Sequence, residues 1–164
     1  MQEYEYSFKV KSIKKYLDYC ENNGYINKSI STQNRKVYEN KNNRKIIARI
    51  TKNTIDGNEE TLLDFKNSTH KENELKISLE SVPIKLGDSN IDNYISLLEL
   101  LEFELVADLY RTRYVYIKDD VEFEIDEYTS PKMNVIAIEG EKNKVDQEFK
   151  TLEDTLNKIY RVED

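Results

Sequence analysis

The first strand-like segment of the chain carries side chains that can bind a metal ion or a phosphate. In EYEYSFKV, residues 3–10, polar and apolar side chains alternate with a period of two, as in a strand with one face of each kind. The polar face carries Glu3, Glu5, Ser7 and Lys9. Carboxylates are ligands for Mg²⁺ or Mn²⁺, and amines bind phosphate oxygens. Either these charges face water, or they face one another across an enclosed site.

The same two-faced pattern recurs along the chain. In LYRTRYVYI, residues 109–117, Arg111 and Arg113 share one face. In VEFEIDEY, residues 121–128, the acidic side chains share one face. With the remaining segments, the charged faces also present Lys45, Arg49, Lys66, Lys76, Glu80, Glu122, Glu124, Asp126 and Glu139.

These segments predict an α+β fold built mainly from antiparallel strands. Short turn-like links between the strands favour antiparallel pairing. The predicted helices are residues 13–22, a helix that begins after Asp88 or Ser89, and a C-terminal helix with Val145 to Ile159 on its apolar face. The strands are predicted at residues 3–10, 33–39, 44–51, 61–68, 72–81, 103–117, 120–128 and 134–141.

Two arrangements of such strands remain open. In the first, an antiparallel sheet packs its apolar face on helices and exposes its charges to water. In the second, the sheet closes with its charged face inward and its apolar face under the helices. A dry interior of unpaired charges would be very costly, whereas one that holds a polyanion and a divalent metal would not be.

Composition excludes several classes of site. The 164 residues fit one domain, residues 1–164, and the net charge of −7 argues against nucleic acid as a partner. No apolar run reaches the length of a membrane span and the N-terminus has no signal-peptide pattern, so we expect no membrane partner and a cytoplasmic location. Cys20 and His70 are the only cysteine and histidine, which excludes an intrachain disulfide and zinc sites rich in either residue.

The order of the segments resembles the CYTH family, the triphosphate tunnel metalloenzymes. MQEYEYSFKV resembles the family's opening ExExK strand, and TQNRKVYEN resembles the second strand. RKIIARIT and LLDFKNS resemble the segments that carry a functional arginine and a phosphate-binding lysine. LYRTRYVYI, DDVEFEIDEY and NVIAIEGE resemble the later basic strand, the acidic strand and the strand that ends in a metal-binding glutamate.

This resemblance implies a closed or nearly closed eight-stranded antiparallel β-tunnel with flanking helices. It also implies Mg²⁺ or Mn²⁺ as cofactor and a small-molecule triphosphate or nucleotide as ligand, with the protein a monomer or homodimer. The matching positions assign catalysis to Glu5 and Lys9. They assign triphosphate binding to Arg49, Lys66, Arg111 and Arg113. They assign metal binding to Glu3, Glu5, Glu122, Glu124 and Glu139, which Asp126 could join.

Three positions depart from the family pattern. Ser7 replaces the lysine of ExExK, with Lys9 two residues further along the same face. Thr51 stands where the family often has a second arginine, and Ala137 where it often has a glutamate. These losses bear on turnover more than on the fold.

The sequence therefore predicts metal-dependent hydrolysis of an inorganic or organic triphosphate inside a charged tunnel. One alternative is cyclisation of ATP, as in the class IV adenylate cyclases of the family. Another is a module that binds a nucleotide or polyphosphate without turnover, which Ser7, Thr51 and Ala137 favour. A sheet protein with an interaction role is the third.

Overall fold

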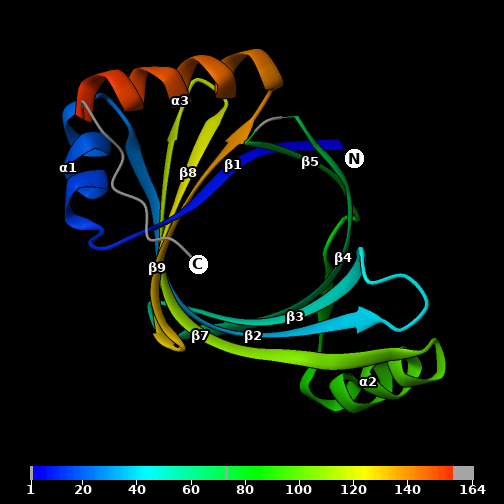
Figure 1. Ribbon diagram of the computed structural model, residues 1–164. Helices are drawn as coiled ribbons and strands as arrows, with labels where there is room; N and C mark the ends of the chain where they lie inside the picture. The colour runs from blue at the N-terminus through cyan, green and yellow to red at the C-terminus, as the bar shows by residue number, and fades with distance from the viewer. Residues whose placement is uncertain (1, 73, 157–164) are drawn as a thin grey trace.

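The computed structural model describes residues 2–72 and 74–156, which form a closed antiparallel β-barrel with three flanking helices (Figure 1). The strands are β1 (Gln2–Val10), β2 (Ile26–Asn40), β3 (Ile46–Ile55), β4 (Asn58–Glu72), β5 (Leu75–Glu80), β6 (Ile84–Leu86), β7 (Phe103–Lys118), β8 (Val121–Ser130) and β9 (Lys132–Gly140). The helices are α1 (Lys14–Asn22), α2 (Ile91–Leu100) and α3 (Lys142–Leu156), and a 3₁₀ turn, Asp88–Asn90, precedes α2.

The barrel is closed by one pairing between strands that are neighbours in sequence. The strand order is β3-β2-β7-β8-β9-β1-β5-β4-β6, and the additional antiparallel pairing of β3 with β4 joins the two ends into a ring of eight strands. The short β6 pairs with β4 and lies outside that ring. Closure removes the exposed strand edges that an open sheet of this size would present.

The apolar faces of the strands point outward, under the helices. One hydrophobic cluster packs β1, β8 and β9 against α1 and α3, and includes the fully buried Phe123, Ile136 and Leu152. A second cluster packs β2, β3 and β4 against α2, with Leu98 of that helix buried. Burying each such side chain stabilises the fold by about 1.5–3 kcal/mol. The charged faces therefore line the interior, as in the second of the two arrangements that the sequence left open.

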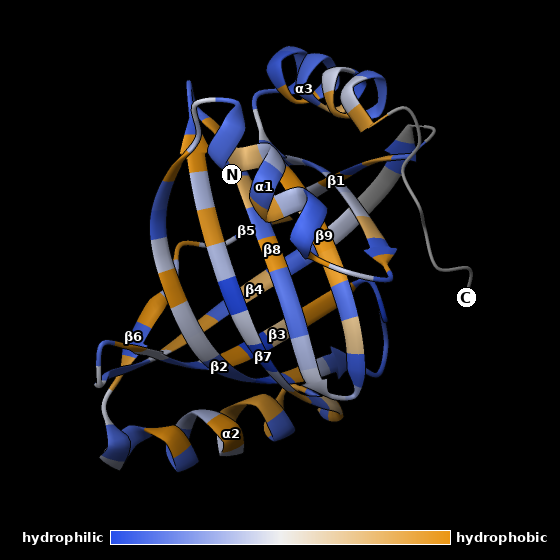
Figure 2. Ribbon diagram, turned by 90° about the vertical axis from the view of Figure 1, so that its left-hand side faces the viewer, coloured by the Kyte–Doolittle hydropathy of each residue, from blue (hydrophilic) through white to orange (hydrophobic). Residues whose placement is uncertain are grey.

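The contact between α3 and β1 fixes the strand that carries Glu3 and Glu5. The rings of Tyr6 and Phe149 stack with centroids 4.1 Å apart, and the Tyr6 hydroxyl donates a 2.7 Å hydrogen bond to Asp146. Because Tyr6 points outward to this contact, its neighbours on β1 point inward. Figure 2 shows α1 and α3 over one part of the barrel and α2 over another.

The predicted elements are confirmed within the described residues, with one difference in extent and one additional strand. β2 begins at Ile26 rather than near residue 33, because its polar first half pairs along β7, from Ile26 with Ile117 onward. The segment after Ser81, where the sequence predicts no strand, contains the short β6. Ile159 of the predicted C-terminal helix lies outside the described residues. Within the described part of the chain, no helix has the length and apolar character needed to span a membrane.

Candidate functional site

The inward faces of the strands enclose three adjoining cavities. The central cavity has a volume of about 340 Å³ and is lined mostly by charged side chains of both signs. The basic cavity adjoins it and has a volume of about 490 Å³; it shares with the central cavity Glu5, Arg35, Arg49, Lys66, Arg111 and Tyr128. The acidic cavity, of about 250 Å³, adjoins the opposite side and shares Glu3, Glu80 and Glu139. The tunnel is therefore polarised from a basic to an acidic end.

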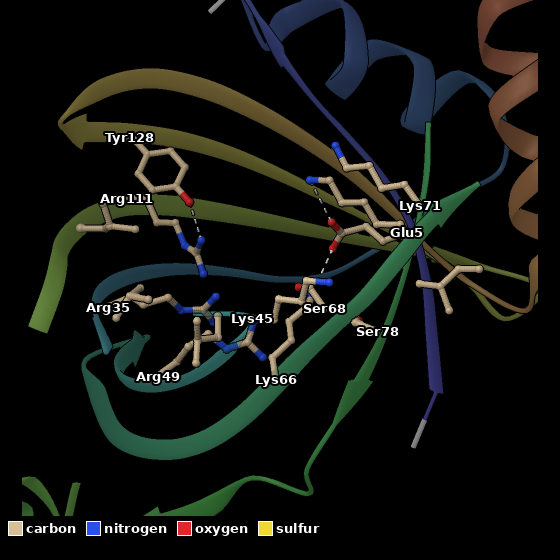
Figure 3. A pocket seen from close by; sticks show the side chains of 15 residues that line it. Glu5, Arg35, Lys45, Arg49, Lys66, Ser68, Lys71, Ser78, Arg111 and Tyr128 are labelled. Carbon is tan, nitrogen blue, oxygen red and sulfur yellow. Dashed lines mark hydrogen bonds and ion pairs between the residues drawn. The ribbon is translucent and has the colours of Figure 1, made fainter. Parts of the chain in front are cut away.

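Three arginines from neighbouring strands, Arg35 on β2, Arg49 on β3 and Arg111 on β7, lie at the junction of the central and basic cavities (Figure 3). Antiparallel pairing brings these strands side by side, with β2 between β3 and β7. We call these residues the arginine layer. Guanidinium groups with free donors are the protein's strongest binders of phosphate oxygens.

Arg35 is the member of the arginine layer that no carboxylate of the described residues contacts directly. Its Nε donates a 3.0 Å hydrogen bond to Thr51 Oγ1, and it makes no ion pair with the described residues. Burial, followed by the nearby charges of Arg111, Arg113 and Arg49, lowers the pKa of Arg35 to about 9, although the charge of Glu124 opposes them. A half-buried cation that lies beside three others and forms no ion pair is costly unless an anion binds there.

Arg111 also keeps a donor free. Its Nε donates to Gln33 Oε1 at 2.8 Å, and its Nη1 donates to the Tyr128 hydroxyl at 2.6 Å and lies 3.4 Å from Asp126 Oδ2. Its Nη2 is buried and has no hydrogen-bond partner. Such an orphaned donor in a polar cavity is expected to bind a ligand acceptor.

By contrast, Arg49 and Arg113 are held by carboxylates. Arg49 forms a two-pronged ion pair with Asp64, its Nε lying 2.9 Å from Oδ1, and contacts Glu80 at 3.1 Å. Arg113 donates to both oxygens of Asp126 at 2.8 and 2.9 Å and also pairs with Glu124. Burial alone would lower the pKa of each arginine, but these carboxylates outweigh it and raise the pKa.

Lys66 lies among three carboxylates at the wall of the central cavity. Its Nζ is 3.2 Å from Glu3, 3.3 Å from Glu80 and 4.0 Å from Glu5. Burial would lower the pKa of Lys66, but these three charges together raise it. The ammonium therefore stays charged at neutral pH and can bind phosphate.

Carboxylates gather toward the acidic end in two groups that could hold a metal ion. Glu3, Glu5 and Glu139 form one group, and Glu122, Glu124 and Glu139 form the other; within each, one oxygen per residue lies within 4.8 Å of the others. Strand register explains the grouping, because Glu139 on β9 is the partner of Glu5 on β1 and of Glu122 on β8.

The protonation of these carboxylates shows how crowded they are. Burial first, and then a hydrogen bond with Glu80, raises the pKa of Glu3 to about 8. Burial and the charge of Glu124 likewise raise the pKa of Glu139, whereas the neighbouring Arg113 outweighs burial and lowers the pKa of Glu124 to about 2. Glu3 with Glu80 and Glu139 with Glu124 are thus hydrogen-bonded carboxyl pairs, in each of which the first member has a raised pKa and the second a lowered one. Such sites fit a divalent cation with oxygen ligands, which would replace the bound protons.

Most of the predicted site residues come together in the tunnel. The central cavity is lined by four of the predicted carboxylates and by all four predicted cations: Glu3, Glu5, Glu124, Glu139, Arg49, Lys66, Arg111 and Arg113. The acidic cavity is lined by Glu122 together with Glu3 and Glu139. Lys9 is the exception: it is exposed and is not among the residues that line these cavities. The assignment of Lys9 to catalysis, in place of the lysine that Ser7 replaces, stays a prediction. The exposed position of Lys9 does not favour it.

Arg35 is the site residue that sequence reasoning missed. The segment RKVYEN was read as a strand without deciding which of Arg35 and Lys36 faces inward. Tyr38 is buried in the outer cluster, and Lys36 shares its side of β2, so Arg35 and Val37 point inward. The signal that could have identified Arg35 as the inward-facing residue was Tyr38, because an aromatic side chain at that position indicates the outward, apolar face.

Comparison with solved structures finds the same fold at low sequence identity. The PH1819 protein from Pyrococcus horikoshii OT3 matches with a TM-score of 0.71 and 20% identity, over 97% of this chain and 93% of that one. HpAC1 from Hippeastrum, whose structure is described as revealing a dominant triphosphatase activity, matches with a TM-score of 0.66 and 14% identity over 93% and 87% of the two chains. A chain of the Schizosaccharomyces pombe Mediator head module matches with a TM-score of 0.64 and 12% identity over 96% and 95%.

No family model and no curated protein sequence matches the chain. At these identities the structural matches show the fold, which is common to the triphosphatase-active HpAC1 and to the Mediator chain.

Proposed function

We propose that the tunnel binds a triphosphate together with Mg²⁺ or Mn²⁺ and hydrolyses its terminal phosphoanhydride bond, as a divergent CYTH-type triphosphatase. The observation that carries the proposal is the state of the arginine layer. Arg35 forms no ion pair with the described residues, and Arg111 has a free buried donor. Both line the central cavity together with the carboxyl pairs Glu3–Glu80 and Glu124–Glu139. Unsatisfied cations next to crowded carboxylates match a polyanion bound with a divalent cation.

In this proposal the chain's own residues bind and orient the substrate. Arg35, Arg111 and Lys66 contact the non-bridging oxygens and neutralise charge that develops on them in the transition state. Glu3, Glu5 and Glu139, with Glu122 and Glu124 beside them, are the ligands for one or two divalent ions, which when bound would supply further neutralisation of the phosphate oxygens.

Glu5 is the carboxylate common to the linings of the central and basic cavities. In that position it can accept a hydrogen bond from the attacking water and orient it. Attack of the water oxygen on the terminal phosphorus breaks the bond to the bridging oxygen, and the products are orthophosphate and the corresponding diphosphate.

Product analysis tests the proposal. The pure protein is incubated with ATP and separately with tripolyphosphate, each with Mg²⁺, Mn²⁺ or EDTA, and the products are separated by ion-exchange chromatography. We expect orthophosphate that depends on the metal and is lost in Glu5→Ala, while Lys144→Ala, which removes a surface cation, serves as the control. An unchanged rate in Glu5→Ala would refute the assignment.

A second candidate is the cyclisation of ATP, which releases pyrophosphate. The basic cavity favours it to the extent that it offers room for a nucleoside next to the arginine layer. In the same experiment, cAMP with pyrophosphate in place of orthophosphate would establish it. Calorimetric binding without any product would indicate a binding module.

A further inference from the structure

From the basic cavity we infer that the ligand is a nucleoside triphosphate, rather than inorganic tripolyphosphate or a triphosphate with a cationic organic group. The inference rests on the proposed function, because it takes the arginine layer as the triphosphate site. It adds the chemical class of the group attached to the triphosphate.

The first observation is an apolar wall on the side of the arginine layer away from the acidic end. On each of the three strands, the residue two positions from the arginine in that direction is apolar: Ile47 before Arg49, Val37 after Arg35, and Leu109 before Arg111. A two-residue step along a strand is about 6.6 Å, and across the strand pairings Leu109 lies opposite Arg35 and Val37 opposite Arg49, so the apolar side chains directly adjoin the arginines in the wall. All three line the basic cavity and none lines the central cavity.

The second observation is the size of the basic cavity. Its volume of about 490 Å³ exceeds the 340 Å³ of the central cavity. The two cavities adjoin, since they share lining residues, so a ligand could occupy both. An inorganic triphosphate needs only charged and polar contacts, and it would leave Ile47, Val37 and Leu109 facing water. A ring system stacked on these half-buried side chains would remove them from water. Apolar side chains in the walls of ligand pockets are usually covered in this way.

The third observation is the charge at the mouth of this cavity. Lys45 and Lys71 line it, are exposed, and form no ion pair with the described residues; Lys76 also lines it and lies 3.8 Å from Glu5. Glu5 is the single carboxylate in the described lining, so the mouth is strongly positive. This field repels a cationic group and accepts a neutral nucleobase or an anionic group.

The test compares catalytic efficiency for three kinds of substrate under one Mn²⁺ concentration. The substrates are a panel of ATP, GTP, CTP and UTP, tripolyphosphate, and thiamine triphosphate, whose thiazolium ring is positively charged. We expect the best nucleotide to exceed both other substrates by about tenfold or more, as buried ring contacts typically allow.

Two sets of variants locate the effect. Leu109→Ser should reduce the nucleotide-to-tripolyphosphate ratio by about tenfold, whereas Leu105→Ser, an exposed leucine on the same strand that pairs with outward-facing Tyr38, should leave the ratio unchanged. Val37→Ser repeats the test from another strand if Leu109→Ser does not fold. The double variant Lys45→Glu, Lys71→Glu should raise the efficiency for thiamine triphosphate relative to ATP.

The outcomes separate this inference from the proposed function. Equal or better use of tripolyphosphate or thiamine triphosphate, or ratios unmoved by the Leu109 and Val37 variants, would overturn the nucleotide assignment while leaving a triphosphatase. Absence of binding and of turnover with every substrate would instead overturn the proposed function.

Discussion

Arg35 and Thr51 lie directly opposite each other on β2 and β3, and Arg35 Nε donates a 3.0 Å hydrogen bond to Thr51 Oγ1. Thr51 stands where the resembled family often has a second arginine. β2 thus places the guanidinium of Arg35 beside Thr51, whose hydroxyl orients it. A cation is therefore present in this part of the tunnel although residue 51 is a threonine.

Replacing Arg35 should separate binding from stability. Arg35→Gln removes a half-buried charge that forms no ion pair with the described residues, so the melting temperature should stay the same or rise. Affinity for tripolyphosphate with Mn²⁺, measured by titration calorimetry, should fall by about tenfold or more, which corresponds to about 1.4 kcal/mol per factor of ten.

Lys36→Gln is the matched control for Arg35. Lys36 is the next residue on β2, points outward and lies 3.8 Å from Asp108 at the surface. It should change neither affinity nor stability by a measurable amount. A marked loss of stability in Arg35→Gln with unchanged affinity would mean that Arg35 is structural.

Asp126 should prove essential to the fold as well as to the site. Its carboxylate is 3% exposed and holds both Arg113 and Arg111. Asp126→Asn removes the negative charge that balances the guanidinium groups of Arg111 and Arg113. We therefore expect the free energy of unfolding to fall by about 3–5 kcal/mol. Urea denaturation measures it, with the exposed Asp108→Asn as control. A loss no greater than that of the control would show that the Asp126 pairs do not support the barrel.

The stability of the metal-free protein should depend on pH through Glu3. Its pKa is raised from 4.5 to about 8 in the folded state, so between these values the unfolded chain has released a proton that the folded protein still holds. Stability contributed by protonated Glu3 is therefore present at low pH and is lost as the pH rises from about 5 to about 8.

Thermal unfolding in EDTA across this pH range tests the effect. Glu3→Gln should flatten the decline, whereas Glu59→Gln, at an exposed position on β4, should leave it unchanged. Mn²⁺ should stabilise the wild-type protein more at pH 8 than at pH 6, because protons compete for the same oxygens. A decline that persists in Glu3→Gln would assign the titration to another group.

Gly140 should be required for the placement of Glu139. It has φ +153°, and a Cβ atom there would lie 2.7 Å from the carbonyl oxygen of Asp120. Gly140→Ala should therefore force the end of β9 away from β8, destabilise the fold by about 1–3 kcal/mol and weaken Mn²⁺ binding. Gly57→Ala, at φ +78° in open space, is the control: it should cost about 1 kcal/mol without affecting the metal. Equal Mn²⁺ affinity in both variants would contradict this role of Gly140.

The strands were predictable from the sequence because alternation is strict where one face is buried. Phe123 and Ile125 alternate with Glu124 and Asp126, and a one-residue slip in register would move all four to the wrong face. Alternation alone did not decide whether the charged face points to water or inward. That choice depends on closure by β3 and β4, a long-range pairing that no local pattern encodes.

The site was predictable in its acidic part and only partly in its cationic part. Glu3 and Glu5 stand out because their strand alternates unambiguously, whereas Glu139 follows the apolar run VIAI and was assigned from the family resemblance. Arg35 was hidden because a basic residue stands on each face of β2 at that point. Ser7 and Ala137, read as two separate losses, prove to be partners across β1 and β9, so the wall carries small side chains at one place in the central cavity.

The most direct test of the account is an anomalous difference map from crystals soaked with Mn²⁺ and a non-hydrolysable triphosphate analogue. The account predicts a manganese peak coordinated by Glu3, Glu5 and Glu139, with phosphate oxygens in contact with Arg35 and Arg111. A fully occupied analogue outside the tunnel, or no manganese peak among these carboxylates, would contradict it.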